Sequence, residues 1–484
     1  MSCSLTIAQL ISVLQATPVS RQLDRNSLAV GICTDTRSLK KGQVFVALRG
    51  SNFDGHNFLA AAIEKGAIAV VIDSRYPNPN PEWPFLTVPD TLKAYQAIAR
   101  WWRDQFSIPI IAVTGSVGKT STKELIAAVL SSIGKVLKTQ RNYNNEIGVP
   151  KTLLELSPEH KFAVVEMAMR GSGQIAELTE IARPTIGVIT NVGTAHIELL
   201  GSEDAIARAK CELLAEMEST SIAILNSDNQ RLIDTAATVW QGQTVTYGLE
   251  GGDLRGELLD LSPELAGDRS SMPRPYTLKV EGVSLPVPLP GRHNALNYLA
   301  ALSVAKVLDV SWQPLEAGLS LELPDGRAKS YELANNIVIL DETYNAGLES
   351  MTAALQLLAE TPGQRKIAVL GTMKELGERS LEFHRQIGSI ARDLKLDALF
   401  IFADPAEAEA IAAGASGLPF VRSLPIDPDP KAPDPEAPET NLNSSGHDKL
   451  AQQLQEFMEP GDRILFKASH SVELNRVVAK MRGF

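Results

Sequence analysis

Cysteine is scarce in this chain, which contains three cysteines in 484 residues, Cys3, Cys33 and Cys211. They are far apart, odd in number and never in a CxxC pair, so neither a disulfide framework nor a zinc site is expected. Long apolar runs are also missing, since none approaches the roughly 18 residues that span a bilayer. These absences favour a protein of the reducing cytoplasm without integral membrane contact.

Positive charge is in deficit, because 46 Lys and Arg stand against 57 Asp and Glu, a formal net charge of −11. A general binder of nucleic acid or of anionic membranes needs a surplus of basic side chains, so the balance argues against both classes. The N-terminus has no basic region before its first apolar residues. Instead, Thr6 and Gln9 have the spacing of a capping box, which predicts a helix and not a signal peptide.

The composition that is present is that of a globular protein, with 44% hydrophobic and 21% charged residues. The length exceeds what one hydrophobic core usually organises, and three domains are expected. We predict an α/β fold with a small N-terminal domain over residues 1–107, a central parallel sheet over 108–325 and a C-terminal Rossmann-like domain over 326–484. The segment 425–446, rich in proline and acidic residues, is predicted to be a mobile surface loop.

Short apolar runs between helix-like segments indicate the strands of each domain. The predicted strands cover residues 43–48 and 67–72 in the first domain, 108–113, 162–166, 185–190 and 221–226 in the second, and 337–341, 366–370, 398–402 and 463–467 in the third. Helices are predicted over 91–105 and 119–132. A hinge is predicted at 323–328, where the third domain would close on the second.

The strongest functional signal is TGSVGKTS at residues 114–121, between a predicted strand and a predicted helix. Glycine lets backbone N–H groups approach phosphate oxygens, and the helix N-terminus adds the positive end of its dipole. Lys119 supplies charge and Thr120 a hydroxyl for Mg²⁺, although Val113 departs from the usual Walker spacing. The predicted nucleotide-binding loop comprises Gly115, Ser116, Val117, Gly118, Lys119, Thr120 and Ser121.

Possible metal ligands follow on the same predicted sheet. Glu166 closes a strand, and His196 and Lys210 come after the next strand. Carboxylate and imidazole suit Mg²⁺ beside phosphates. A buried histidine with satisfied partners and a glutamate in an ion pair are the alternatives, but phosphoryl transfer requires a metal near the transferred phosphate, which favours a metal site.

Eight segments in succession resemble the motifs of Mur ligases over nearly the whole chain. They are TGSVGKTSTKE, NYNNEIGVP, EMAMRG, TNVGTAHIELLGS, IARAK, PGRHNALNYLAAL, DETYNAG and LGTMKELGERS. In the first domain, TDTRSLKKGQVFVALRGSNFDGHNF resembles the UDP-binding domain of the later-acting members. Within the family the segments are most similar to the ligases that add D-alanyl-D-alanine to UDP-N-acetylmuramoyl-tripeptide. The resemblance implies a cytoplasmic, monomeric ATP-dependent amide ligase of peptidoglycan synthesis that acts through an acyl phosphate.

The resemblance also implies a role for each matched residue. Lys119 would hold the β- and γ-phosphates, Thr120 and Glu166 one Mg²⁺, and His196 a second. Lys210 matches a lysine that is carbamylated in several relatives and bridges the metals. The remaining matches are His293 and Asn294 for adenine, Arg327 and Asp341 for γ-phosphate and ribose, Asp35, Thr36, Arg37, Asp54, Gly55 and His56 for the UDP-sugar, and Asn144 and Asn145 for the precursor. Lys119, His196, Lys210 and Arg327 would be the catalytic residues.

The sequence departs from the family pattern in two motifs. Ala468 and His470 stand where glycine and arginine are usual, and Leu348 stands where proline is frequent, so the amine site is the least defined by the resemblance. One alternative is the sister ligase that adds diaminopimelate or lysine to the dipeptide precursor, although its DNPR-type signature is absent. The other alternative is a non-catalytic nucleotide-binding scaffold or regulatory NTPase.

Overall fold

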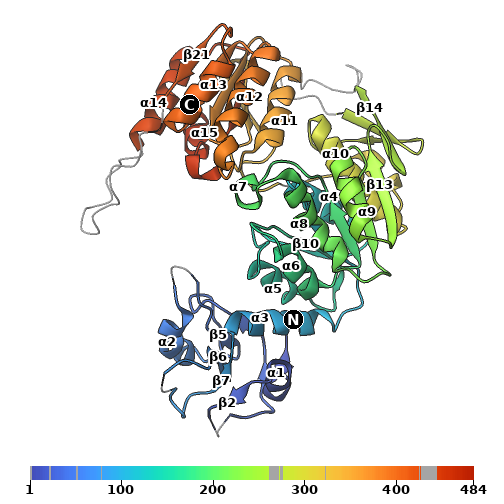
Figure 1. Cartoon of the computed structure of the whole chain (residues 1–484), viewed down its shortest axis with the longest axis vertical. Coiled ribbons are helices and arrows are strands. Elements are labelled where there is room, and N and C mark those ends of the chain that lie inside the picture. The colour runs from blue at the N-terminus through green and yellow to red at the C-terminus, as the bar shows by residue number, and fades with distance from the viewer. Residues whose placement is uncertain are drawn as a thin grey trace.

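The computed structural model describes residues 3–20, 23–50, 53–77, 79–260, 272, 276–321, 323–424, 426 and 444–483. The strands form three large sheets, each built from one uninterrupted stretch of sequence, and a separate two-stranded ribbon. The three sheets with their helices follow one another along a curved molecule, with the first and third domains at its two ends (Figure 1). The predicted α/β class with three domains is confirmed, whereas the boundaries at 107 and 325 stay predictions.

The N-terminal domain contains a five-stranded sheet in the order β2-β7-β6-β5-β4. Its elements are β1 (Leu5–Thr6), α1 (Ile7–Leu14), β2 (Thr17–Pro18), β3 (Leu28–Ala29), β4 (Ile32–Cys33), β5 (Val44–Val46), η1 (Gly55–Phe58), α2 (Leu59–Glu64), β6 (Ala69–Asp73), β7 (Phe85–Val88) and α3 (Thr91–Arg103). Strands β5 and β6 are buried along their whole length, as expected of apolar strands covered on both faces. The predicted capping box is confirmed, because Thr6 Oγ1 accepts from Gln9 N at 3.1 Å and Gln9 Oε1 accepts from Thr6 N at 2.8 Å.

Helix α3 fastens the N-terminal domain to the central domain. Near its C-terminal end, Trp102 Nε1 donates a hydrogen bond to Leu156 O at 3.1 Å. The Arg103 guanidinium donates to Ala182 O at 2.8 Å and to Arg183 O at 2.7 Å. Because these carbonyls end elements of the central domain, the first two domains are joined by directional bonds as well as by the chain.

The central domain contains a nine-stranded sheet in the order β16-β15-β14-β13-β12-β11-β8-β10-β9. Its elements are β8 (Ile110–Thr114), α4 (Lys119–Ser131), β9 (Lys135–Lys138), α5 (Gly148–Leu153), β10 (His160–Glu166), α6 (Gln174–Ala182), β11 (Ile186–Ile189), α7 (Ile197–Leu200), α8 (Glu203–Ala215), β12 (Ile222–Asn226), α9 (Gln230–Val239), β13 (Gln243–Gly248), β14 (Leu254–Asp260), β15 (Tyr276–Val280), β16 (Val283–Pro286), α10 (Arg292–Val307) and η2 (Gln313–Ala317). Strands β9 to β14 and β8 pair in parallel, and β14, β15 and β16 form an antiparallel extension that the sequence did not predict. Helices α4 and α10 share one apolar core with the sheet, and α6 and α8 contribute to the other.

The C-terminal domain contains a six-stranded sheet in the order β17-β18-β22-β19-β20-β21. Its elements are β17 (Lys329–Leu333), η3 (Ala334–Asn336), β18 (Ile337–Asp341), α11 (Leu348–Glu360), β19 (Lys366–Gly371), η4 (Gly377–Arg379), α12 (Ser380–Asp393), β20 (Ala398–Phe402), α13 (Pro405–Gly414), β21 (Val421–Ser423), α14 (Ser444–Phe457), β22 (Arg463–Lys467), η5 (His470–Val472) and α15 (Asn475–Met481). Strand β17 is antiparallel to β18, and the other pairs are parallel. The predicted loop 425–446 lies largely outside the described residues.

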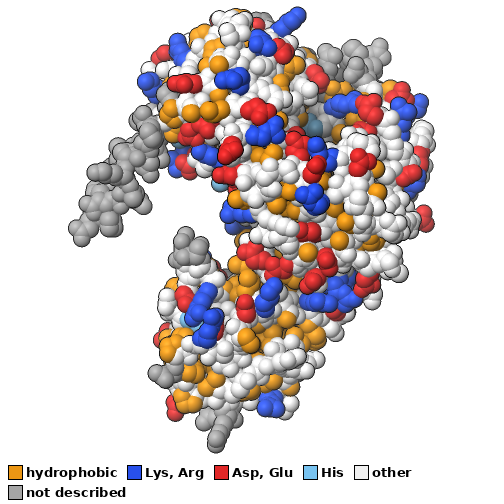
Figure 2. Space-filling model, viewed as in Figure 1, with side chains coloured by type: hydrophobic (Ala, Val, Ile, Leu, Met, Phe, Trp, Pro, Cys, Tyr) orange, Lys and Arg blue, Asp and Glu red, His pale blue; other side chains and the backbone are white. Residues whose placement is uncertain are grey.

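The surface carries acidic and basic side chains interspersed over all three domains, and an open space separates the first domain from the third on one side of the molecule (Figure 2). Within the described residues no helix has both the length and the apolar character needed to cross a membrane. The carboxyl ends of the central parallel strands, where ligands usually bind in such sheets, face the junction with the C-terminal domain (Figure 1).

Candidate functional site

The phosphate loop lies between β8 and α4 and has a backbone that only glycine adopts easily. Gly115 has φ +148° and Gly118 has φ +84°. A Cβ at position 115 would lie 1.9 Å from Thr190 Oγ1, and one at position 118 would lie 2.5 Å from Asn297 Oδ1. Both glycines are therefore required by conformation and by space.

The loop is also held from outside by the segment that follows β11. Asn191 O accepts from Ser116 N at 3.0 Å, and Asn191 Oδ1 accepts from Val117 N at 3.0 Å. Gly193 N in turn donates to Ser116 Oγ at 2.9 Å. These bonds fix the loop before any ligand arrives, which favours electrostatic preorganisation.

Lys119 begins α4, and its ammonium group turns back over the loop. Its Nζ donates to Gly115 O at 2.7 Å and to Ser116 O at 3.2 Å. Burial lowers the pKa of Lys119, the nearby Glu166 carboxylate opposes that change, and the Arg327 guanidinium adds to it. The predicted phosphate-binding lysine and the predicted γ-phosphate arginine are thus brought into one electrostatic environment.

Glu166 lies at the end of β10 in a buried polar network. Its two carboxylate oxygens accept from Thr120 Oγ1 at 3.0 Å and from Asn144 Nδ2 at 2.8 Å. The buried Lys123 ammonium lies 3.7 Å from the oxygen that Thr120 contacts. The structure therefore unites two predicted magnesium ligands and shows that Asn144, predicted to contact the precursor, has Glu166 as its partner.

Lys210 lies in α8 and is 2% exposed. Within the described residues no hydrogen bond or ion pair of its ammonium group is present. Burial lowers the pKa of Lys210 well below its usual range, and the positive charge of Lys119 lowers it further. An uncharged amine is the nucleophilic form of lysine, so this environment prepares the side chain for reaction with an electrophile.

His196 lies before α7, at the junction with the C-terminal domain. Its Nδ1 pairs with a carboxylate oxygen of Glu375, which follows β19. Two residues earlier, Thr194 N and Oγ1 donate to the two oxygens of Glu349 at 2.6 and 3.2 Å. Neither glutamate was predicted as a site residue, although both lie in or beside the motifs DETYNAG and LGTMKELGERS.

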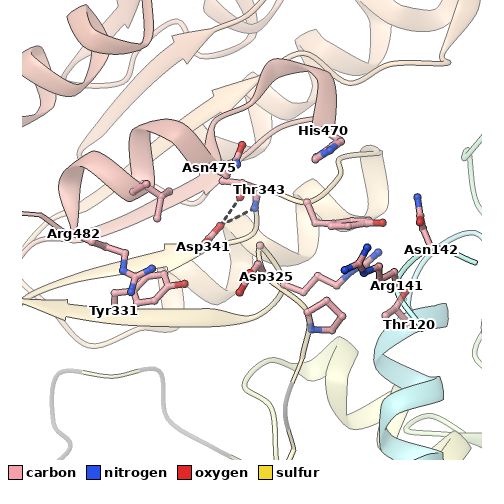
Figure 3. A pocket seen from close by; sticks show the side chains of 16 residues that line it. Thr120, Arg141, Asn142, Asp325, Tyr331, Asp341, Thr343, His470, Asn475 and Arg482 are labelled. Carbon is pink, nitrogen blue, oxygen red and sulfur yellow. Dashed lines mark hydrogen bonds between the residues drawn. The ribbon is translucent and has the colours of Figure 1, made fainter. Parts of the chain in front are cut away.

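A pocket of about 470 Å³ lies between the start of α4 and the C-terminal domain (Figure 3). It is lined by Thr120, Arg141, Asn142, Pro324, Asp325, Gly326, Arg327, Tyr331, Asp341, Thr343, Tyr344, His470, Asn475, Val478, Ala479 and Arg482. Three of these side chains are arginines, which supply the local positive charge that an anionic ligand requires. Arg141 and Asn142 approach from the central domain, opposite the residues of the C-terminal domain (Figure 3).

Arg327 and Asp341, predicted to reach the γ-phosphate and the ribose, both line this pocket. The Arg327 guanidinium lies over the Tyr344 ring, 3.8 Å from its centroid, and Arg327 Nε is buried with no hydrogen-bond partner in the described structure. Asp341 Oδ1 accepts from Thr343 N at 3.1 Å and from Thr343 Oγ1 at 2.6 Å. An unpaired buried donor is costly, so Arg327 is suited to an acceptor that a ligand supplies. His470 stacks on the same tyrosine, with ring centroids 5.8 Å apart.

His293 and Asn294 lie in the first turn of α10. Burial lowers the pKa of His293 to about 4, and the neighbouring Lys467 charge acts in the same direction. Asn294 donates to Pro290 O at 2.7 Å and accepts from Asn297 Nδ2 at 3.1 Å. Asn294 is therefore tied to its own helix start, and its predicted adenine contact stays a prediction.

The predicted UDP-sugar residues form two local groups in the N-terminal domain. Asp35 pairs with the exposed Arg37 at 2.7 Å, and Thr36 O accepts from a lysine. In the second group, His56 Nδ1 pairs with Asp54 at 2.6 Å and His56 Nε2 accepts from Asp73 N at 3.0 Å. Both ring nitrogens of His56 are thus engaged inside the domain, next to the close backbone packing of Gly55. Asn145 Oδ1 likewise accepts from Gly148 N, at the start of α5, at 2.9 Å.

Comparison with known proteins places this geometry in a family. The model of the Mur ligase middle domain matches residues 113–305, that of the Mur ligase, glutamate ligase domain matches 326–470, and that of the Mur ligase family, catalytic domain matches 29–102. The UDP-N-acetylmuramoyl-tripeptide--D-alanyl-D-alanine ligase of Synechocystis sp. is 55% identical over 93% of this chain and 91% of its own. The ligase of the same name from Escherichia coli is 35% identical over 85% of this chain and 88% of its own.

Solved structures give the same result. A crystal structure of MurF from Acinetobacter baumannii superposes with a TM-score of 0.85 at 29% identity and covers all of both chains. MurF ligase from Thermotoga maritima in complex with ADP superposes with a TM-score of 0.78 at 29% identity, over 94% of this chain and 97% of that one.

Proposed function

The chain belongs to the Mur ligase family, and we infer that it is the ATP-dependent ligase joining D-alanyl-D-alanine to UDP-N-acetylmuramoyl-tripeptide. The observation that carries this function is the likeness to the Synechocystis ligase, which extends through all three domains. The sister ligase for diaminopimelate or lysine and the non-catalytic scaffold are both less well supported, because three relatives that are 32–55% identical over 85–98% of this chain carry the name of the D-alanyl-D-alanine ligase.

The reaction joins a carboxylate and an amine, and ATP removes the carboxylate oxygen as phosphate. The carboxylate first attacks the γ-phosphorus and forms an acyl phosphate as ADP leaves, and the amine then displaces phosphate and gives up a proton. The main barrier is the approach of one anion to another. Lys119 and Arg327, which share one electrostatic environment, would offset that repulsion as charge moves in the transition state.

We propose ATP binding across the pocket between α4 and the C-terminal domain. The phosphate loop, residues 115–121, would hold the phosphates, and the unpaired Arg327 Nε would find its acceptor on the γ-phosphate. Asp341 would contact the ribose, and His293 and Asn294 the adenine side. The structure of the Thermotoga maritima relative in complex with ADP supports nucleotide binding by this chain.

Magnesium fits the oxygen donors beside the loop. The hydroxyl of Thr120 and the carboxylate of Glu166 are buried within hydrogen-bond distance of each other, and His196 would hold a second ion. Within the described residues no cluster of three or more His, Cys, Asp and Glu could hold a metal, so the nucleotide phosphates would complete the coordination. Magnesium would withdraw charge from the transferred phosphoryl group.

Lys210 is proposed to carry a carbamate. Its uncharged amine would attack CO₂, the N–C bond would form, and one proton would leave to solvent. The product is an anion in place of a potential cation. Such a group would give the metals a bridging carboxylate that the encoded side chains nearby do not supply.

The precursor would bind with its UDP part in the N-terminal domain. Asp35, Thr36 and Arg37 with Asp54, Gly55 and His56 are proposed for that end, and Asn144 and Asn145 for the peptide end. The firm attachment of α3 to the central domain supports this arrangement, because it keeps the two ends at a fixed separation. We place the reaction in the cytoplasm, where ATP is available, and propose that the chain acts as a monomer.

The function is tested by phosphate release with ATP, Mg²⁺ and UDP-N-acetylmuramoyl-tripeptide, with and without D-alanyl-D-alanine, and by the mass of the product. Release that requires D-alanyl-D-alanine and gives the pentapeptide precursor is the expected result. Release only with the dipeptide precursor and diaminopimelate or lysine would keep the family and change the substrate. ATP binding or hydrolysis that no precursor stimulates would contradict the ligase function.

A further inference from the structure

One segment of the central domain, residues 190–198, connects the phosphate loop with the C-terminal domain. Its first part bonds to the loop through Asn191 and Gly193. Its last part meets Glu349 and Glu375 of the C-terminal domain. Figure 1 shows α7, which ends this segment, at the junction of the two domains. Any change in how the domains dock therefore acts on residues that are bonded directly to the phosphate loop.

Glu375 docks on this segment through both its side chain and its backbone. The carboxylate pairs with His196 Nδ1, and the Glu375 carbonyl oxygen accepts from Glu198 N at 3.3 Å. His196 has φ +66° and Glu375 has φ +63°, in the left-handed region of the backbone that residues other than glycine rarely adopt. Such a conformation on both sides of one contact persists only where the surrounding structure enforces it.

The carboxylate determines which nitrogen of His196 carries the proton. An ionised carboxylate only accepts hydrogen bonds, so Nδ1 is the donor, and in a neutral ring the lone pair then lies on Nε2. Neutral imidazole with a free lone pair is the form that binds a metal ion. A carboxylate on the opposite ring nitrogen is the common way in which proteins fix that form and the ring orientation.

Glu349 provides an internal comparison, because it docks the same two domains without contacting the imidazole. Its oxygens accept from the backbone N–H and the hydroxyl of Thr194. A Cβ on Gly193 would lie 2.4 Å from the same carboxylate, so the domains approach closely here. A comparison of Glu349 with Glu375 therefore distinguishes the effect of domain docking alone from the effect of the contact with His196.

We propose that Glu375 is a positioning residue that, when the C-terminal domain docks, orients His196 as a ligand for the second divalent cation of the nucleotide site. The role of His196 rests on the proposed function. Because the two events are linked, the docked domain strengthens cation binding and the cation in turn favours the docked domain.

The test measures Mn²⁺ binding, by the electron paramagnetic resonance signal of free Mn²⁺, to protein saturated with a non-hydrolysable ATP analogue. The variants are Glu375→Ala, Glu349→Ala, His196→Ala and the double variant of 375 and 196. Glu375→Ala is expected to weaken the second Mn²⁺ site about 10-fold, the usual effect of removing such an outer partner. Glu349→Ala is expected to weaken it less, and Glu375→Ala is expected to add nothing once His196 is absent.

Three results would overturn the proposal. Equal effects of Glu375→Ala and Glu349→Ala would mean that docking alone matters. Tighter Mn²⁺ binding in Glu375→Ala would mean that Glu375 competes with the cation for the imidazole. Additive losses in the double variant would mean that Glu375 acts without His196. Amide synthesis by the unmodified protein is assayed in parallel, so a failure of the proposed function is observed separately.

Discussion

At the scale of single residues, buried charge and backbone conformation explain more of the site than residue type does. Lys210 illustrates this, because a lysine on a helix is usually a solvated cation. Here the side chain is buried without a described counter-charge, beside a second lysine. This environment disfavours the charged ammonium form, and the chemistry proposed for Lys210 depends on that effect.

Lys210→Ala is expected to lower the rate of ligation by roughly 100-fold, the typical loss when one charge-stabilising group of a transition state is removed. Unmodified protein freed of CO₂ should lose activity and regain it with bicarbonate. Lys210→Arg, which forms no stable carbamate, should stay inactive with bicarbonate, and the exposed Lys161→Ala serves as the control. Full activity of Lys210→Arg would contradict the carbamate. Phosphate release is the measurement.

Gly118→Ala is expected to weaken ATP binding on the order of 10-fold, because a left-handed backbone costs about 1–2 kcal/mol outside glycine. The added Cβ would also press on Asn297. Calorimetric titration with ATP measures the loss. Gly251→Ala is the matched control, since its Cβ would meet open space, and ATP binding that is equally weak in both variants would argue against the loop geometry.

His293 should make the protein sensitive to acid. Its pKa is lowered to about 4, so between the ordinary value of 6.5 and 4 the unfolded chain binds a proton that the folded protein does not. Stability is therefore lost as the pH falls through that window, by up to about 3 kcal/mol. His293→Gln removes this pH-dependent loss of stability. The thermal midpoint of the variant should therefore fall less than that of the unmodified protein between pH 7 and 4.5. Parallel falls would contradict the assignment.

At the scale of elements, the sequence predicted strands that depend on local patterns better than strands that depend on pairing with other segments of the chain. Strands β18, β20 and β22 have the predicted bounds, because each is a short apolar run that is buried on both faces. The antiparallel strands β14, β15 and β16 were missed, since they depend on pairing with each other, which no single segment of the sequence records.

The same distinction holds for the site. The phosphate loop and the approach of Thr120 to Glu166 follow from a strand, a turn and a helix, which are local patterns. The contact of His196 with Glu375 spans 179 positions and two domains, and no local pattern encodes such a distance in sequence. Asn144, predicted to contact the precursor, donates to Glu166 from 22 positions away, and its contact with the precursor stays a prediction.

Helix α3 offers a test at this scale, because its first turn depends on one side chain. Asp90 Oδ1 accepts from Leu92 N at 2.8 Å and from Lys93 N at 3.0 Å. Asp90→Ala is expected to lower the free energy of unfolding of the N-terminal domain by about 1 kcal/mol. Denaturant unfolding monitors this loss, and Asp90→Asn should retain most of the stability. A loss as large in Asn as in Ala would show that the cap is not the cause.

At the scale of the whole molecule, the junctions on the two sides of the central domain differ. On the N-terminal side, Trp102 and Arg103 bond to main-chain carbonyls, which no change of charge removes, in addition to the ion pairs of Lys93 with Glu177 and of Asp104 with Arg183. On the C-terminal side, the bonds around α7 come from the carboxylates of Glu349 and Glu375. The C-terminal domain is therefore the part expected to move about the predicted hinge at 323–328.

Glu349→Ala is expected to shift the ligand-free protein toward more open forms, because it removes two hydrogen bonds to a charged acceptor, each worth about 1.5–3 kcal/mol. Small-angle X-ray scattering should report a larger radius of gyration. Glu409→Ala, on the exposed side of α13, removes the same charge without a contact between domains and should leave the radius unchanged. Identical radii for the two variants would contradict the role given to Glu349.

The order of the sheets along the chain has a consequence for synthesis on the ribosome. Since each sheet uses one uninterrupted stretch, the first can close after Val88, before the strand that precedes the phosphate loop has emerged. The second sheet can close before the C-terminal domain is complete. Translation thus completes the first two domains before the C-terminal domain. Nascent chains released early would contain the phosphate loop but would lack the carboxylates of Glu349 and Glu375 that bond to the segment beside it.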